Sequence, residues 1–223
     1  MLTNLFSIFD PNSSLNYSMN WMSIFISMLF FPNTFWFKKN KWSIFIKLII
    51  MFLFNEMKNM MQKQNLNNII FFLMLFFLFI MMNFMGLFPY IFTPTSHLTV
   101  TLPMSITIWM SIMLFGWINK TKFMFAHLVP VSTPSLLMPF MVIIETISNI
   151  IRPGTLAIRL SANMIAGHLL LCLLGSTGPT LSNNYILLIM ILMQIMLFSL
   201  EMAVSIIQSY VFMTLSSLYS NET

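Results

Sequence analysis

Five ionisable side chains lie inside two long apolar stretches of the chain, where charged residues are rare. They are Glu145, Arg152, Arg159, His168 and Glu201. A charged side chain near the centre of a bilayer costs about 2.5–3.5 kcal/mol on insertion scales, so such a residue usually has a function. Glutamate and histidine can carry a proton, whereas the arginine guanidinium stays charged and acts only on neighbouring charges. These residue types therefore predict proton movement past a fixed cation.

The spacing of these residues puts a titratable group on either side of Arg159. On an α-helix, Glu145 lies roughly 21 Å before Arg159 along the axis, and His168 lies roughly 14 Å after it. Around the helix, Glu145 is about 40° and His168 about 180° from Arg159. Two offset proton half-channels would need such a cation between separate acid–base groups, because it blocks a direct leak. The chain offers no mid-membrane carboxylate opposite Arg159, so an anionic partner from another protein is expected.

A second set of polar residues recurs at every seventh position of the last apolar stretch. Gln194, Glu201 and Gln208 would form a stripe along one face of a helix, and Ser205 belongs to the same stripe. The stripe supports a polar path beside the charges of the preceding stretch.

The four ionisable residues of the first long apolar stretch, which precede Glu201, each also have a purely structural interpretation. Arg159 could extend to the membrane surface, Glu145 could be interfacial, and His168 could be a packed histidine. Arg152 could be a lone structural cation or a lipid-headgroup contact.

The remaining histidines and the cysteine give no sign of a metal site. His97 and His127 lie in or beside loops and are expected to have no function. Cys172 lies alone in an apolar run, which suggests neither a disulfide nor a metal ligand. No metal and no other cofactor is expected.

The composition identifies the environment of the chain. Of 223 residues, 58% are hydrophobic and 7% are charged, whereas soluble domains have about 45–50% and about 25%. A soluble fold of this size cannot bury so much apolar surface, which excludes soluble enzymes, disulfide-stapled secreted domains and disordered tails. The chain is therefore predicted to be an all-α integral membrane protein with one domain in the lipid bilayer.

The coding bias points to an organelle. The chain has 24 Met and 24 Phe, and eight of its ten basic residues are lysines. This bias is typical of an AT-rich mitochondrial gene, although an AT-rich bacterium is the alternative. The net charge of +5 is explained by lysine-rich loops, so no nucleic-acid partner is expected.

Apolar runs predict about five membrane-spanning helices and one interfacial amphipathic helix. Residues 42–54 contain Lys47 and are too short to cross, so they form the interfacial helix. The last two spans far exceed the about 20 residues of a perpendicular span and must be strongly tilted, with bends expected at Pro139 and Pro153. Residues 1–18 are expected outside the membrane. The predicted spans are residues 20–37, 68–88, 98–118, 134–174 and 185–219.

The lysines predict the orientation. If the spans alternate, all eight lysines lie on one side: six fall between the first two spans, and Lys120 and Lys122 follow the third. The opposite loops, 89–97 and 175–184, hold no lysine or arginine. The positive-inside rule therefore predicts an outer N-terminus and an inner C-terminus.

The stretch RPGTLAIRLSANMIAGHLLL, residues 152–171, resembles subunit a of F-type ATP synthases, the family of mitochondrial ATP synthase subunit 6. The pattern is specific, because Arg159 is followed four residues later by Asn163 and then by AGH. The resemblance covers nearly the whole chain, and the N-terminal residues are most similar to insect mitochondrial forms. It includes LFSIFDP, NFMGLFPYIFTPTSHL, HLVPVSTPSLLMPFMVIIETIS and, in the last helix, EMAVSIIQSYVF.

This resemblance implies a mechanism and a set of partners. In the family, the last two helices form a tilted hairpin beside a rotating ring of small two-helix subunits, each with a mid-membrane carboxylate. Peripheral-stalk and other membrane subunits complete the complex in the mitochondrial inner membrane. The N-terminus then faces the intermembrane space and the C-terminus the matrix.

The resemblance also implies roles for single residues. Arg159 becomes the essential gate opposite the ring carboxylate, and Asn163 and Gln208 are its polar neighbours. His168 and Glu201 lie on the intermembrane-space side, where protons arrive, and Glu145 lies on the matrix side, where they leave. The family often has an aspartate after its last tyrosine; here Glu222 is the nearest acid, and its part in proton release is left open.

Other functions fit the sequence less well. A secondary proton or cation transporter could use Glu145, His168 and Glu201 internally, but it predicts inverted repeats, and the sequence shows none. A structural subunit of a respiratory complex leaves Arg159 unexplained, and a voltage sensor needs a regular series of arginines. No Walker-type glycine loop is present, so the chain is expected to be non-catalytic by itself.

Overall fold

The computed structural model describes residues 5–12, 17–29, 40–61, 63–88, 90–129, 134, 137–178 and 184–222, and all regular elements within them are helices. The prediction of an all-α membrane protein is thereby confirmed. The elements are η1 (Leu5–Phe9), η2 (Met19–Met22), α1 (Ser23–Leu29), α2 (Lys41–Met60), η3 (Lys63–Asn68), α3 (Ile69–Gly86), η4 (Pro94–Ser96), α4 (Leu98–Asn119), α5 (Thr121–His127), α6 (Met138–Thr177) and α7 (Asn184–Glu222).

Within the described residues, four helices are long and apolar enough to cross a membrane. They cover Leu66–Gly86, Leu98–Asn119, Met138–Thr177 and Tyr185–Asn221, each within about one helical turn of a predicted span. The first predicted span, residues 20–37, is represented by the short apolar helix Met19–Leu29. Its second half lies outside the described residues.

The predicted interfacial helix is longer than residues 42–54. Helix α2 continues to Met60 because residues 55–60 contain neither glycine nor proline. Its last turns bury Leu53 and Met57, whereas Trp42 and Phe52 are exposed. The position of α2 at the membrane surface stays a prediction.

The core lies where α3 and α7 pack together, with α6 beside them. The ring of Phe79 on α3 is 4.4 Å from that of Phe212 on α7, and Leu156 and Leu160 of α6 belong to the same cluster, as do residues of α2 and α4. The buried side of α7 consists largely of serines, whose small size allows close helix contact. Each of their hydroxyls donates to the carbonyl three residues earlier; they are Ser205, Ser209, Ser216, Ser217 and Ser220.

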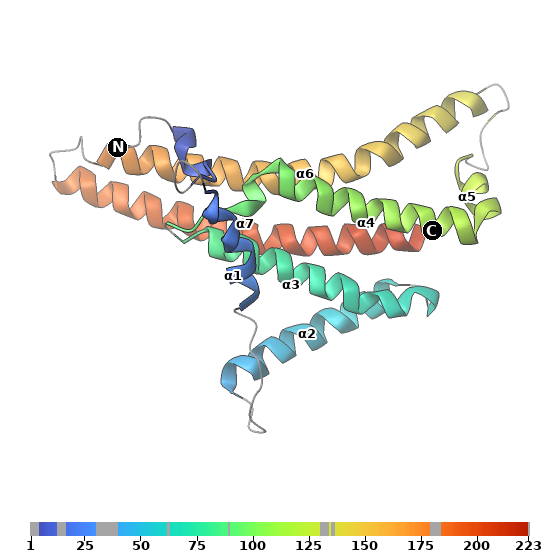
Figure 1. Cartoon of the computed structure of the whole chain (residues 1–223), viewed down its shortest axis with the longest axis horizontal. Helices are drawn as coiled ribbons and strands as arrows, with labels where there is room; N and C mark the ends of the chain where they lie inside the picture. Colours follow the sequence, from blue (N-terminus) through green and yellow to red (C-terminus); the bar gives the residue numbers. More distant parts are fainter. Residues whose placement is uncertain are drawn as a thin grey trace.

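The four long helices alternate in direction along the long axis of the molecule, so that the start of α6 and the end of α7 lie at the same end as α5 (right in Figure 1). The first half of α6, drawn in yellow, turns away from α7. Pro153 lies inside α6 and removes one backbone hydrogen bond, which explains a bend there. Pro139 lies in the first turn of α6, where proline is tolerated without a bend. The expected bend at Pro139 is therefore wrong.

Candidate functional site

Arg159 lies on an exposed and largely apolar face of α6. The residues that share this face by helical spacing are also exposed; they are Ile151, Thr155, Ile158, Ala162, Ala166 and Leu170. The opposite face of the helix is buried through Leu156, Leu160 and Met164. Within the described parts of the chain, no hydrogen bond or ion pair involves the Arg159 guanidinium. Among the described residues, Arg159 is thus a cation without a partner on a largely apolar face.

Glu201 has the opposite environment, because it points from α7 into the protein. The residue is only 7% exposed. Both of its carboxylate oxygens are buried, and neither has a hydrogen-bond partner in the described structure. Together with Asn163 and Leu87 it lines a cavity of about 260 Å³. Asn163 follows Arg159 by one turn of α6, so this cavity lies next to the cation.

Gly167 on α6 makes room for the Glu201 carboxylate. A Cβ atom built on Gly167 would lie 2.8 Å from both Cδ and Oε1 of Glu201. That distance is too short for any side chain, so only glycine permits the observed contact between α6 and α7. The next residue, His168, leaves its Nε2 atom buried and without a hydrogen-bond partner among the described residues.

His168 lines a second and larger cavity. This cavity has a volume of about 680 Å³, and its wall includes Cys172, Phe198 and the loop that follows α3. Leu87 lines both cavities, which therefore adjoin at the step from Gly167 to His168. Two of the predicted proton carriers, His168 and Glu201, are thus brought to neighbouring cavities.

Asn83 on α3 is a polar residue that the sequence interpretation missed. It is fully buried, and neither amide atom has a partner in the described structure. Asn83 precedes Leu87 by one helical turn and so shares its face toward the cavities. Buried polar atoms without protein partners normally bind ordered water. The signal was available, because Asn83 is the one polar residue after Asn68 in the predicted span 68–88.

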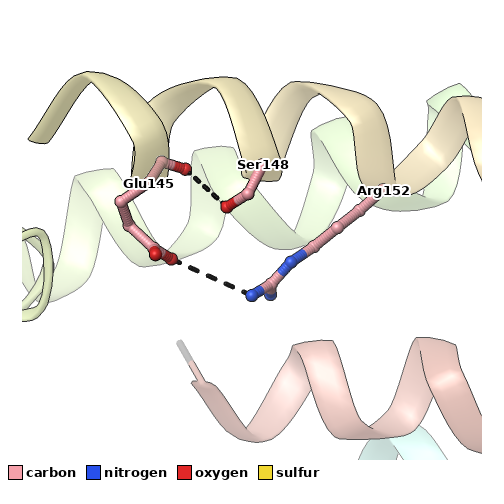
Figure 2. Close-up of polar contacts among 3 residues, drawn as sticks. All are labelled: Glu145, Ser148 and Arg152. Carbon is pink, nitrogen blue, oxygen red and sulfur yellow. Dashed lines mark hydrogen bonds and ion pairs between the residues drawn. The ribbon is translucent and has the colours of Figure 1, made fainter. Parts of the chain in front are cut away.

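Glu145 and Arg152 form an ion pair on α6. Their Oε1 and Nη2 atoms are 3.9 Å apart, and the side chains are 32% and 26% exposed. Figure 2 shows both side chains leaving the same side of the helix and turning toward each other. The Ser148 hydroxyl between them donates to the Glu145 carbonyl oxygen at 2.8 Å. Arg152 is therefore not the lone cation that one interpretation of the sequence expected.

The Arg152 guanidinium has a second neighbour near the end of α7. Its central carbon lies 5.1 Å from the centre of the Tyr219 ring, a cation–π distance. Both residues line a cavity of about 260 Å³ that also includes Asn149, Trp109 and Trp117. Because α6 runs through both regions, this cavity and the one at Glu201 lie on opposite sides of Arg159 along the helix.

The polar stripe of α7 faces inward in part. Glu201 and Ser205 are buried, and Gln194 and Gln208 are half-buried. The Gln194 amide nitrogen would lie 3.8 Å from a Cβ atom on Gly175, so this residue faces α6. The Ser205 hydroxyl donates to the Met202 carbonyl oxygen at 2.8 Å. Because its hydroxyl is bonded within its own helix, Ser205 contributes to close helix packing as well as to the polar stripe.

Another acidic residue, Glu56, was missed because it lies just after the predicted interfacial helix, residues 42–54, in a part of α2 that the prediction did not include. The Tyr210 hydroxyl of α7 donates to Glu56 Oε2 at 3.3 Å, which ties α2 to α7. The side chains of Glu222 and His127 lie outside the described part of the structure, so their roles stay predictions.

Comparison with known proteins gives a consistent result over the whole chain. The family model described as "ATP synthase A chain" matches residues 17–221. The chain is 57% identical over 224 residues to ATP synthase subunit a of Drosophila melanogaster, and the match covers 100% of this chain and 99% of the relative. It is 56% identical to the protein of that name from Anopheles quadrimaculatus and 57% identical to that from Aedes albopictus, with the same coverage.

Proposed function

Because the chain belongs to the ATP synthase A chain family and is thus a membrane-sector subunit of an ATP synthase complex, we propose that it carries protons to and from a rotating ring. In this proposal, two half-channels end on either side of Arg159. The subunit performs no nucleotide chemistry itself, so ATP synthesis occurs on other subunits and is driven by proton flow. Each proton yields about 2.3 kcal/mol per 100 mV of membrane potential.

The unpaired cation carries this proposal. A guanidinium without a partner on an apolar membrane-facing surface is costly, and a carboxylate brought by another protein would offset that cost. Small residues flank Arg159, since Ala162 and Ala166 share its face and permit close approach of a second helix. A ring of small two-helix subunits, each with one mid-membrane carboxylate, fits this surface. Arg159 then discharges each carboxylate and prevents protons from crossing directly.

The buried groups beside Arg159 are proposed as the uptake path. Protons enter the larger cavity at His168, pass to Glu201 in the smaller one, and reach the ring near Asn163. Asn83 is added to this path because its amide has no partner among the described residues and therefore favours ordered water. Gln208 and Gln194 contribute polar surface on α7.

The Glu145–Arg152 region is proposed as the release path. Its partial exposure lets water reach Glu145, and the ion pair keeps the carboxylate oriented. The lysine distribution supports a matrix location for this end and an intermembrane-space location for the uptake cavity. The complex would accordingly lie in the mitochondrial inner membrane, with peripheral-stalk and other membrane subunits as further partners.

Replacement of the cation tests the proposal. The variant Arg159→Ala should lose ATP-driven proton pumping completely, while vesicles stripped of the nucleotide-binding sector should still conduct protons passively. Ile147→Ala is a matched control, because Ile147 is exposed on the same helix but lies about three turns before Arg159, and this variant should retain pumping. Pumping by Arg159→Ala at the wild-type rate would overturn the proposal.

A further inference from the structure

His97 holds a segment that is far away in the sequence. It lies just before α4 and is half-buried. Its Nε2 atom is 2.9 Å from the Phe9 carbonyl oxygen in η1. A carbonyl oxygen only accepts hydrogen bonds, so Nε2 must carry the hydrogen and donate it.

The His97 ring is fixed by two aromatic neighbours. Its centre lies 5.5 Å from that of Trp21 and 5.2 Å from that of Phe92, and these two rings contact each other at 5.5 Å. An imidazole packed in this way cannot turn freely, so its donor stays aimed at Phe9.

The segment that His97 holds reaches the uptake cavity. The Phe9 ring meets the His168 ring edge-on, with centres 6.4 Å apart and an angle of 82° between the planes. The preceding residue, Ile8, lines the 680 Å³ cavity together with His168 and Cys172. A five-residue 3₁₀ turn is too short to be stable alone, so its position depends on bonds to the rest of the chain. Besides His97, Asn20 provides one by donating to the Asp10 carbonyl oxygen at 3.3 Å.

We propose that His97 is a positioning residue of the uptake path: it holds η1 against α6, so that Phe9 restrains the His168 ring and η1 closes one wall of the cavity. The proposal rests on the function proposed for His168. It gives His97 a role, although its loop position in the sequence predicted none. The edge of η1 then borders the cavity from which water and protons reach His168.

The single cysteine of the chain provides a direct reporter. Cys172 is half-buried, has a free thiol and lines the same cavity. Its labelling rate is measured with a charged, membrane-impermeant methanethiosulfonate, applied to the assembled complex in vesicles and read by mass spectrometry of this subunit. Labelling reports access to the cavity and does not depend on proton transport.

Two variants of His97 separate the hydrogen bond from the ring. His97→Phe keeps a flat ring but loses the donor, and it should label Cys172 about fivefold faster, the shift expected when one hydrogen bond no longer opposes opening. His97→Gln keeps an N–H donor and should stay within about twofold of the wild-type rate. Proton pumping should change in His97→Phe and be restored in His97→Gln, a rescue that general misfolding would not give.

Further variants decide the remaining outcomes. Phe9→Ala removes the ring but leaves the carbonyl acceptor, and it should also label faster. Wild-type labelling in His97→Phe would overturn the proposal, and so would failure of both His97→Phe and His97→Leu to assemble while His97→Gln assembles. If labelling follows the prediction but Glu201→Gln pumps normally, the proposed function fails and the positioning of η1 by His97 stands.

Discussion

The two glutamates of the proposed proton paths have contrasting surroundings. Glu201 is buried against the backbone of Gly167 without a partner for either oxygen among the described residues. Glu145 is about one-third exposed and paired with Arg152 at 3.9 Å. A buried carboxyl group without protein partners is stabilised either by hydrogen bonds to enclosed water or by being protonated. A partly exposed ion pair is instead solvated by outside water. In the proposed mechanism, proton transfer is therefore confined at Glu201 and open to outside water at Glu145.

The regions around Glu201 and Glu145 also differ in how many segments of the chain form them. The surroundings of Glu201 require three segments of the chain, since α6 supplies Gly167 and Asn163, the residue after α3 supplies Leu87, and α7 supplies the acid. The pair at Glu145 needs only α6, with a ring from α7 beside it. Small errors of packing should therefore disturb proton uptake more than proton release.

The largest effect is expected from the same amide substitution at the two acids. Glu201→Gln should reduce ATP-driven proton pumping at least about tenfold, because a positioned proton-transfer group contributes about 10²–10⁴-fold and enclosed water can replace only part of it. Glu145→Gln should reduce pumping less, because outside water reaches that site. Pumping is measured by fluorescence quenching in vesicles. Equal pumping rates in the two variants would show that the two glutamates do not differ in their dependence on enclosed water.

The next effect concerns the close contact at Gly167. Gly167→Ala places a Cβ atom 2.8 Å from the Glu201 carboxylate, so the acid must move, and pumping should fall about threefold to tenfold. Gly154→Ala is the matched control on the same helix, because nothing lies within 4 Å of its added Cβ. The control should pump normally and gain slightly in stability from helix propensity. Identical pumping by both variants would show that the contact is not needed.

A smaller effect is expected at Asn83. Asn83→Leu removes an amide that has no partner in the described structure, so thermal stability should be unchanged or higher. Pumping should nevertheless fall about twofold to threefold, because one site for ordered water is lost. Asn68→Leu, at the exposed start of the same span, should leave pumping unchanged. A clear loss of thermal stability in Asn83→Leu would indicate a structural hydrogen bond instead.

The smallest effect is predicted for the ion pair. Arg152→Gln should lower the free energy of unfolding by less than about 1 kcal/mol, the usual range for partly exposed pairs. A thermal melt of the assembled complex with each single variant and the double variant Glu145→Gln, Arg152→Gln gives the coupling between the two residues. A coupling of several kcal/mol would show that this region is as enclosed as that of Glu201.

Much of this arrangement could be predicted from the sequence. The apolar runs gave the two long helices within about one turn, and the position of Arg159 in such a run indicated an unpaired cation. The pair of Glu145 and Arg152 could also have been found, since residues seven apart share a helix face.

What could not be predicted depends on contacts between distant segments. The space that Gly167 leaves for Glu201 exists only because α6 and α7 are in contact at these two residues. The bond from His97 to Phe9 joins residues 88 positions apart, and no local pattern predicts it. The same holds for the bond from Tyr210 to Glu56, which depends on how α2 packs against α7.

Sidedness of access tests the central claim most directly. Single cysteines at Asn163 and Asn149, in a chain with Cys172→Ser, would be labelled in vesicles of each orientation with a charged impermeant thiol reagent. Asn163 lines the Glu201 cavity and Asn149 the Arg152 cavity. We expect labelling at 163 only from the lysine-poor side and at 149 only from the lysine-rich side. Labelling of both positions from one side would contradict two separate paths that end at Arg159.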